Sequence, residues 1–105
     1  MPKATRISDQ TVGICDVGLP CCPHSRSGTN ATGSPTVFIN DLAAHRVTDT
    51  GPTNCPHSGT FQSTQGSPTV FVNDLPLTRV GDTTICEDCG EIGQHSTGSE
   101  TVFVN

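Results

Sequence analysis

The chain has 105 residues, of which only 31% are hydrophobic and 4% aromatic, and its ten acidic and five basic residues give a net charge of −5. This length fits one domain, and so few apolar side chains predict a small core that needs a disulfide, a metal or a partner as a further stabiliser. The negative charge and the scattered basic residues argue against a nucleic-acid surface, and no apolar run approaches the roughly 20 residues of a membrane span.

The cysteines are the first candidates for that stabiliser. The N-terminal residues lack the apolar stretch of a secretory signal, so we expect the chain to fold in the cytoplasm, where thiols stay reduced. Six cysteines in such a chain favour metal binding over disulfides. A small disulfide-rich secreted binding protein remains the alternative interpretation.

One phrase occurs three times along the chain. GSPTVFIN at residues 33–40 returns as GSPTVFVN at 66–73 and as GSETVFVN at 98–105, at spacings of 33 and 32 residues. Each copy begins with turn formers and continues with β-branched and aromatic residues, which indicates a short strand. Alternation places Val37 and Ile39 on one face of the first strand, and Thr36 and Phe38 on the other.

A second phrase, Arg-Ile/Val-x-Asp, begins at Arg6, Arg46 and Arg79. It defines repeats of about 6–40, 46–73 and 79–105, joined by Asn-Asp pairs that favour hairpin turns. One hairpin unit cannot bury both of its faces, but three can by packing about a common axis. The sequence therefore predicts one all-β domain over residues 1–105, with three pseudo-threefold β-hairpin repeats forming a small cone.

Metal ligands are predicted at one repeated position. The residue nine places before each Gly-Ser pair is a metal-binding type in all three repeats: His24, His57 and Cys89. If the repeats surround a common axis, these three side chains face it and supply three-quarters of a tetrahedral zinc site at the vertex.

The fourth ligand has several candidates. The first repeat carries seven or eight extra residues, which we interpret as a loop over roughly 12–20. This insertion contains Cys15, our preferred fourth ligand, and Cys86 is its close rival. Cys22 and Cys55 are further possibilities. The zinc would be structural, because a closed four-ligand site leaves no open position for catalysis.

Other polar residues have simpler interpretations. His45 and His95 fall outside the repeated ligand position, so we do not expect them to bind metal. Arg46 and Arg79, each followed three residues later by an aspartate, are interpreted as turn-stabilising partners and not as catalytic groups. A zinc hydrolase with Glu87 or Asp88 as its base would need an open three-ligand site, so we predict that the chain is not an enzyme.

These phrases resemble those of the PAAR-repeat proteins over nearly the whole chain. Counterparts of the Pro-Ala-Ala-Arg phrase are Leu42-Ala43-Ala44-His45-Arg46 and Leu75-Pro76-Leu77-Thr78-Arg79. The resemblance implies a short cone of β hairpins with a structural zinc near its vertex, held by His and Cys.

The same resemblance implies a place in an injection device. Such proteins sit as monomeric caps on a trimeric β-helical spike (VgrG-like, or a phage central spike) in type VI secretion systems and contractile phage tails, and some act with effector proteins. The expected function is therefore a tip that caps and sharpens a membrane-piercing spike, made in the cytoplasm and delivered through target membranes without stable insertion. We expect six valines and isoleucines to hold the base on the spike, namely Val37, Ile39, Val70, Val72, Val102 and Val104.

Overall fold

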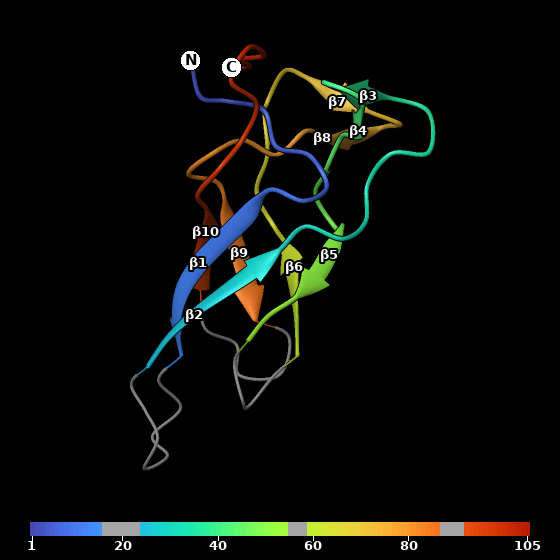
Figure 1. Cartoon of the computed structure of the whole chain (residues 1–105). Helices are drawn as coiled ribbons and strands as arrows, with labels where there is room; N and C mark the ends of the chain where they lie inside the picture. Colours follow the sequence, from blue (N-terminus) through green and yellow to red (C-terminus); the bar gives the residue numbers. More distant parts are fainter. Residues whose placement is uncertain (16–23, 55–58, 87–91) are drawn as a thin grey trace.

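The computed structural model describes residues 1–15, 24–54, 59–86 and 92–105, with Cys15 and His24 described by their backbones alone. All regular structure in these ranges is β, and the molecule measures 42 × 25 × 21 Å. Figure 1 shows a sheet in the middle and short hairpins at one end. Among the described residues there is no helix that is long and apolar enough to cross a membrane. The all-β prediction is confirmed.

The sheet has six antiparallel strands in the order β2-β1-β10-β9-β6-β5. Their bounds are β1 Gln10–Cys15, β2 His24–Thr29, β5 Thr50–Pro52, β6 Thr60–Ser63, β9 Thr83–Cys86 and β10 Ile92–His95. The two outer strands, β2 and β5, approach each other through a bridge between Gly28 and Thr53. The sheet is therefore nearly closed and resembles a barrel.

The extra residues of the first repeat differ from our prediction. We expected a loop over roughly 12–20, but Val12 to Cys15 continue strand β1, which pairs with β2 as far as Cys15 opposite His24. Alternation of apolar and polar residues was too short here to signal a strand by itself. Part of the additional length therefore makes the β1–β2 pair longer than β5–β6.

Two hairpins project from one end of the sheet (Figure 1). They consist of β3 (Phe38–Ile39) with β4 (Leu42–Ala43), and β7 (Phe71–Val72) with β8 (Leu75–Pro76). The connecting Asn and Asp have φ values of 52° and 66° in both hairpins. Two consecutive positive φ values define a type I′ turn, which Asn and Asp tolerate better than most residues. The predicted hairpin turns are confirmed.

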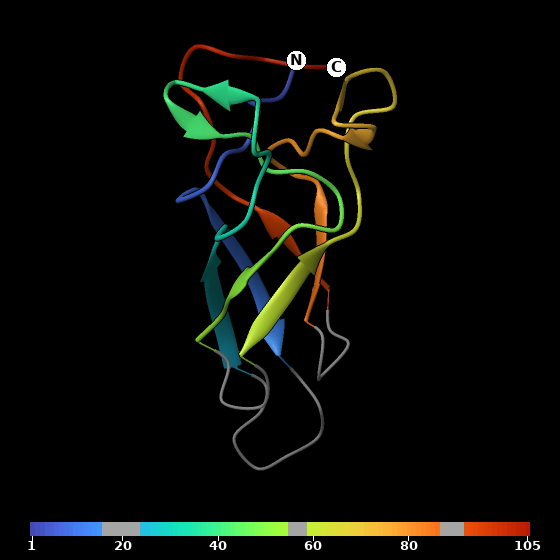
Figure 2. The same cartoon turned by 90° about the vertical axis from the view of Figure 1, so that its right-hand side faces the viewer.

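The two chain ends pair in the same way at this end of the molecule. Lys3 bridges to Phe103, and the Val104 N–H donates to the Pro2 carbonyl at 2.9 Å. Both views place the N- and C-termini on the side of the hairpins (Figure 2). The third repeat thus makes a split hairpin, completed by the start of the chain, which the sequence phrases did not reveal.

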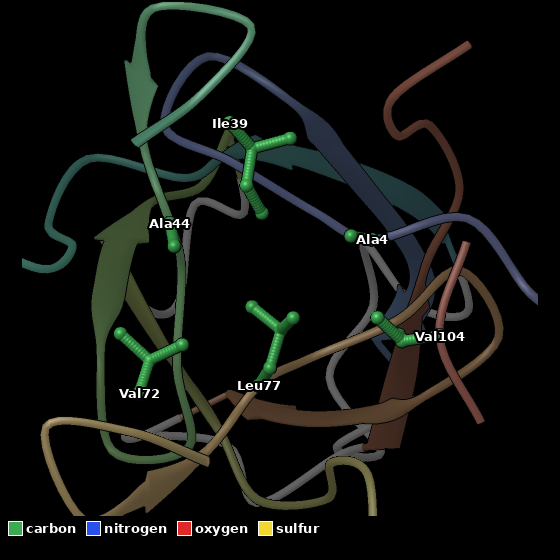
Figure 3. Packing of buried hydrophobic residues seen from close by; sticks show 6 residues of the cluster. All are labelled: Ala4, Ile39, Ala44, Val72, Leu77 and Val104. Carbon is green, nitrogen blue, oxygen red and sulfur yellow. The ribbon is translucent and has the colours of Figure 1, made fainter. Parts of the chain in front are cut away.

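A small apolar core lies among the three hairpins. Its buried members come in two repeated sets (Figure 3). Ile39, Val72 and Val104 each come directly before the asparagine that ends a repeated phrase, and Ala4, Ala44 and Leu77 each come two residues before the arginine of the next phrase. Ile39 is buried whereas Phe38 is exposed, so the predicted alternation holds for this pair.

Beneath this core, three backbone hydrogen bonds close a ring. The Thr5 N–H donates to Thr78, the Thr78 N–H to His45, and the His45 N–H to Thr5, at 3.1, 3.1 and 3.2 Å. All three residues are fully buried. The residue directly before the arginine that begins each repeat therefore contributes one donor and one acceptor to the same closed set, which ties the three repeats together without a continuous strand.

The Arg-x-x-Asp phrases form identical turns. In each, the aspartate accepts hydrogen bonds from the arginine side chain and from the arginine N–H; for Arg46 and Asp49 both contacts are 2.8 Å. The pairs Arg6–Asp9 and Arg79–Asp82 repeat this geometry. The predicted role of Arg46 and Arg79 as turn partners is confirmed.

Candidate functional site

Two of the four predicted metal ligands belong to described strands of the sheet. Cys15 ends β1 and His24 begins β2, and their backbones are directly opposite each other. His57 and Cys89 lie outside the described residues, as do the side chains of Cys15 and His24. In the part of the chain that the structure describes, no group of three or more His, Cys, Asp or Glu could hold a metal. The four-ligand zinc site thus stays a prediction.

The donor set itself fits zinc. Directly opposite residues of an antiparallel pair have Cα atoms about 4.5–5.5 Å apart, so Cys15 and His24 start close enough to share one ion. Two thiolates and two imidazoles are usual ligands of a structural zinc. The rival fourth ligand, Cys86, is fully buried on β9, opposite Phe61. Cys22 and Cys55 fall outside the described ranges.

The two remaining histidines meet inside the sheet, which the sequence analysis did not foresee. His45 and His95 are buried with their rings edge to face, 5.2 Å apart, and both direct Nε2 at the hydroxyl of Ser63. The distances from Ser63 Oγ are 2.7 Å to His45 and 2.9 Å to His95. A signal existed in the repeats: His95 occupies the position of Asn30 and Ser63, all three buried.

The hydrogen bonds assign the protons of this cluster. His45 Nδ1 faces the Thr32 carbonyl at 2.8 Å and must therefore donate. The neutral ring then accepts the Ser63 hydroxyl proton at Nε2, and Ser63 Oγ accepts from Nε2–H of His95. His95 Nδ1 is left as a buried acceptor without a partner among the described residues. Both histidines are neutral in this arrangement.

Burial also disfavours the charged forms. It lowers the pKa of His45 against the opposing hydrogen bond to Thr32. Burial, and secondly the nearby His45, lower the pKa of His95 to about 3. Buried neutral imidazoles that are hydrogen-bonded to a serine hydroxyl and a carbonyl have a structural role here.

The hairpin end is the surface that we expected to form the base of the cone, and its exposed residues differ from those that we predicted. Of the six aliphatic residues that we expected there, Val37 is exposed, at 38%. Ile39, Val72 and Val104 are instead buried in this chain's own core, and Val70 and Val102 pack against it. The hairpin strands expose the aromatic residue of each repeat instead, with 60, 56 and 45% of Phe38, Phe71 and Phe103 accessible. The β alternation turns the aliphatic side chains inward and therefore turns the phenylalanines outward.

Comparison with known families decides the assignment. The family model described as PAAR motif matches residues 22–89 and 51–105, which together span most of the chain. The chain belongs to the PAAR-motif family. A search of curated proteins found no match.

The structure explains the parts of the PAAR phrase in this chain. Its alanine position is Ala44 in one copy and Leu77 in the other, and both side chains are core members. Its arginine, Arg46 or Arg79, pairs with the aspartate three residues later. This PAAR chain therefore keeps a small or aliphatic core residue and an ion-paired arginine, while other positions of the phrase vary.

Proposed function

We propose that this protein is the structural tip of a contractile injection system, and that it caps and sharpens a trimeric β-helical spike. Membership of the PAAR-motif family suggests a spike-tip protein. The observation that carries the finer proposal is the hairpin end, where each repeat exposes one phenylalanine. Three matching apolar side chains on one chain suit a partner that has three identical chains.

A pseudo-threefold cone is part of this proposal. The ring through Thr5, His45 and Thr78 supports it, as do the three equivalent Arg–Asp turns. Because corresponding residues make corresponding contacts, one chain can present three similar edges. A single protomer can then cover the exposed strand edges of a trimer, which would otherwise pair with other chains.

We further propose a structural zinc at the vertex, held by His24, His57, Cys89 and Cys15. When bound, the ion would supply the tip with cross-links between its loops. The fold needs such a stabiliser because the core around Leu77 is small and the sheet interior is largely polar. Metal binding by folded loops contributes directly to folding free energy in small domains.

The proposal treats the protein as a non-enzyme that is synthesised in the cytoplasm and joins the spike afterwards. It also predicts binding as a monomeric cap, with effector proteins as further partners. A disulfide-rich secreted binding protein is the competing hypothesis. Metal content and thiol titration separate the two, since about one zinc per chain with reduced thiols favours the tip.

Spike binding is the direct test. A trimeric β-helical spike protein from the same genome is mixed with the chain, and the mass of the complex is measured by light scattering. We expect one chain per trimer, and loss of binding when Phe38, Phe71 and Phe103 are all replaced by Asp. The matched control is Ile92→Asp, which changes an exposed apolar residue on the sheet, 67% accessible, and should leave binding intact. Three chains per trimer, or equal binding by both variants, would overturn the proposal.

The zinc has its own test. Protein purified without a metal-affinity step is measured by mass spectrometry, and we expect about one zinc per chain. The double variant His24→Ala, His57→Ala should lose both the metal and thermal stability. A folded wild-type protein without metal would contradict the ligand assignment.

A further inference from the structure

Two asparagine side chains are bound in matching pockets of hydrogen-bonding groups at the hairpin end. Asn40 Oδ1 accepts from Ser99 Oγ at 2.5 Å and from Arg6 Nη1 at 3.0 Å, and its Nδ2 donates to Thr101 Oγ1 at 2.9 Å. We call these three groups the first amide socket. They donate to the carboxamide oxygen and accept from its NH₂ group, so they are specific for an amide among polar side chains.

The second amide socket repeats this arrangement. Asn73 Oδ1 accepts from Ser34 Oγ at 2.5 Å and from Arg46 Nη1 at 3.1 Å, while Nδ2 donates to Thr36 Oγ1 at 3.0 Å. The asparagine and the serine of each socket belong to different repeats. Each bound amide therefore fastens one hairpin to its neighbour.

A third amide socket is built from Ser67, Thr69 and Arg79. The N–H groups of Thr69 and Val70 donate to Ser67 Oγ at 3.1 and 2.9 Å, as the corresponding groups do in the other sockets. Arg79 is held by Asp82 at 2.8 and 2.7 Å, like the other socket arginines. Ser67 and Arg79 are thus held in place before any amide arrives.

No carboxamide contacts this third socket among the described residues. The Ser67 hydroxyl has one acceptor for its proton there, Thr69 Oγ1, at 3.4 Å. Ser67 is nevertheless 1% exposed. A buried hydroxyl with so poor an acceptor is unfavourable, because burial has removed the water that it would otherwise bond. The socket therefore favours a ligand with an acceptor oxygen and a donor NH₂ side by side.

We propose that the third amide socket binds the side-chain carboxamide of Asn105. Asn105 occupies the repeat position of Asn40 and Asn73, and Val104 before it is already fixed by its bond to Pro2. In this structure Asn105 is exposed.

In the docked state, Oδ1 of Asn105 accepts from Ser67 and Arg79, and Nδ2 donates to Thr69. This bond set locks the split hairpin onto the second repeat, as Asn40 and Asn73 lock the two covalent hairpins. The inference concerns the chain's own cohesion and does not depend on the proposed spike partner.

Side-chain amide resonances of the full chain test the docking by NMR. The Asn105 NH₂ signal, identified by its loss in Asn105→Ala, should exchange with solvent about tenfold more slowly than a free amide, as one added hydrogen bond implies. Ser67→Ala should abolish this protection. The matched control Ser34→Ala should release Asn73 and leave Asn105 protected.

A second variant keeps the test valid if Ser67→Ala fails to fold. Thr69→Val removes one acceptor on an exposed side chain and should shift the Asn105 signal while leaving that of Asn40 in place. An Asn105 signal that exchanges like a free amide in the wild-type chain would overturn the proposal. So would one that is protected but unchanged in both socket variants.

Discussion

The two ends of this small molecule have different interiors. Between the hairpins the core is aliphatic, with Ile39, Val72 and Leu77 among its members. Inside the sheet the buried side chains are mainly polar, and His45, Ser63 and His95 form a connected set. Aliphatic packing is non-directional and insensitive to protons, whereas the polar interior depends on specific donors, acceptors and protonation states. The same repeat thus supports two modes of stabilisation, and each can be broken separately.

Acid should have the largest effect, and only on the polar interior. Because the pKa values of His45 and His95 lie below the unfolded value near 6.5, the unfolded chain binds more protons below that pH. Stability is therefore complete above about pH 6.5 and falls as the pH drops. The contribution of His95 is lost down to about pH 3, with a slope approaching about 1.4 kcal/mol per pH unit, and His45 adds to the loss in the same direction. Denaturant unfolding followed by circular dichroism from pH 7.5 to 4.5 measures this slope.

The control for acid uses residues from the other repeats. The variant His45→Thr, His95→Ser places in these positions the residues found at Thr5 and Ser63. Its unfolding free energy should vary less between pH 6.5 and 4.5. Asp49 acts at lower pH: burial raises its pKa, but hydrogen bonds from Arg46 and Thr32 outweigh burial and lower the pKa overall. An equal slope in the variant would show that the histidines are not the cause.

Leu77→Ala should break the aliphatic interior. Leu77 is buried and is the largest side chain of its set, whose other two members are Ala4 and Ala44. Truncation of a buried leucine costs about 2–5 kcal/mol, and no titrating group is involved. The loss in unfolding free energy should therefore be equal at pH 7 and pH 5.5. A strongly pH-dependent loss would mean that the two interiors are coupled.

Ser63→Ala should have an intermediate effect on the polar interior. It removes the hydroxyl shared by the two histidines and leaves their Nε2 atoms without this partner. An unsatisfied buried group costs about 1–3 kcal/mol. Ser27→Ala, at an exposed position on β2, is the matched control and should change the thermal midpoint little. Equal midpoints for the two variants would count against the shared hydroxyl.

The smallest effect is expected at the turns outside both interiors. Thr48 has a φ of 80°, whereas Gly81 takes the same turn position at 94°. A β-branched residue is strained there, so Thr48→Gly should stabilise the fold by up to about 1 kcal/mol despite the flexibility of glycine. The reverse exchange, Gly81→Thr, should destabilise it. Thermal melts of the two variants should shift in opposite directions, and a shift of both in one direction would exclude backbone strain as the reason.

The sequence made the local structure predictable because each local feature repeats. The Asn-Asp turns, the Arg46–Asp49 pair and the inward side of Ile39 all follow from residues close together in the chain. Contacts between repeats were harder to predict, since no residue near Thr5 in the sequence indicates that its N–H donates to Thr78. His95 was missed for the same reason: its partner Ser63 belongs to another repeat.

The predicted metal site shows a further limit. The equivalence of His24, His57 and Cys89 follows from spacing, but our preferred fourth ligand, Cys15, lies in a part of the first repeat that has no counterpart in the others. Repeat logic therefore cannot choose between Cys15 and Cys86. That choice depends on side-chain positions near the ends of β1 and β9.

The split hairpin makes this chain equivalent to a ring that has been cut once. Asn105 and Met1 occupy the positions of Asn40 and Asp41, so one peptide bond between them would restore a third Asn-x turn in register. The cut can then be moved: a circular permutant that begins at Asp41 and ends at Asn40 would keep every contact between strands. The position of the chain ends among the three repeats can therefore change while the fold stays the same.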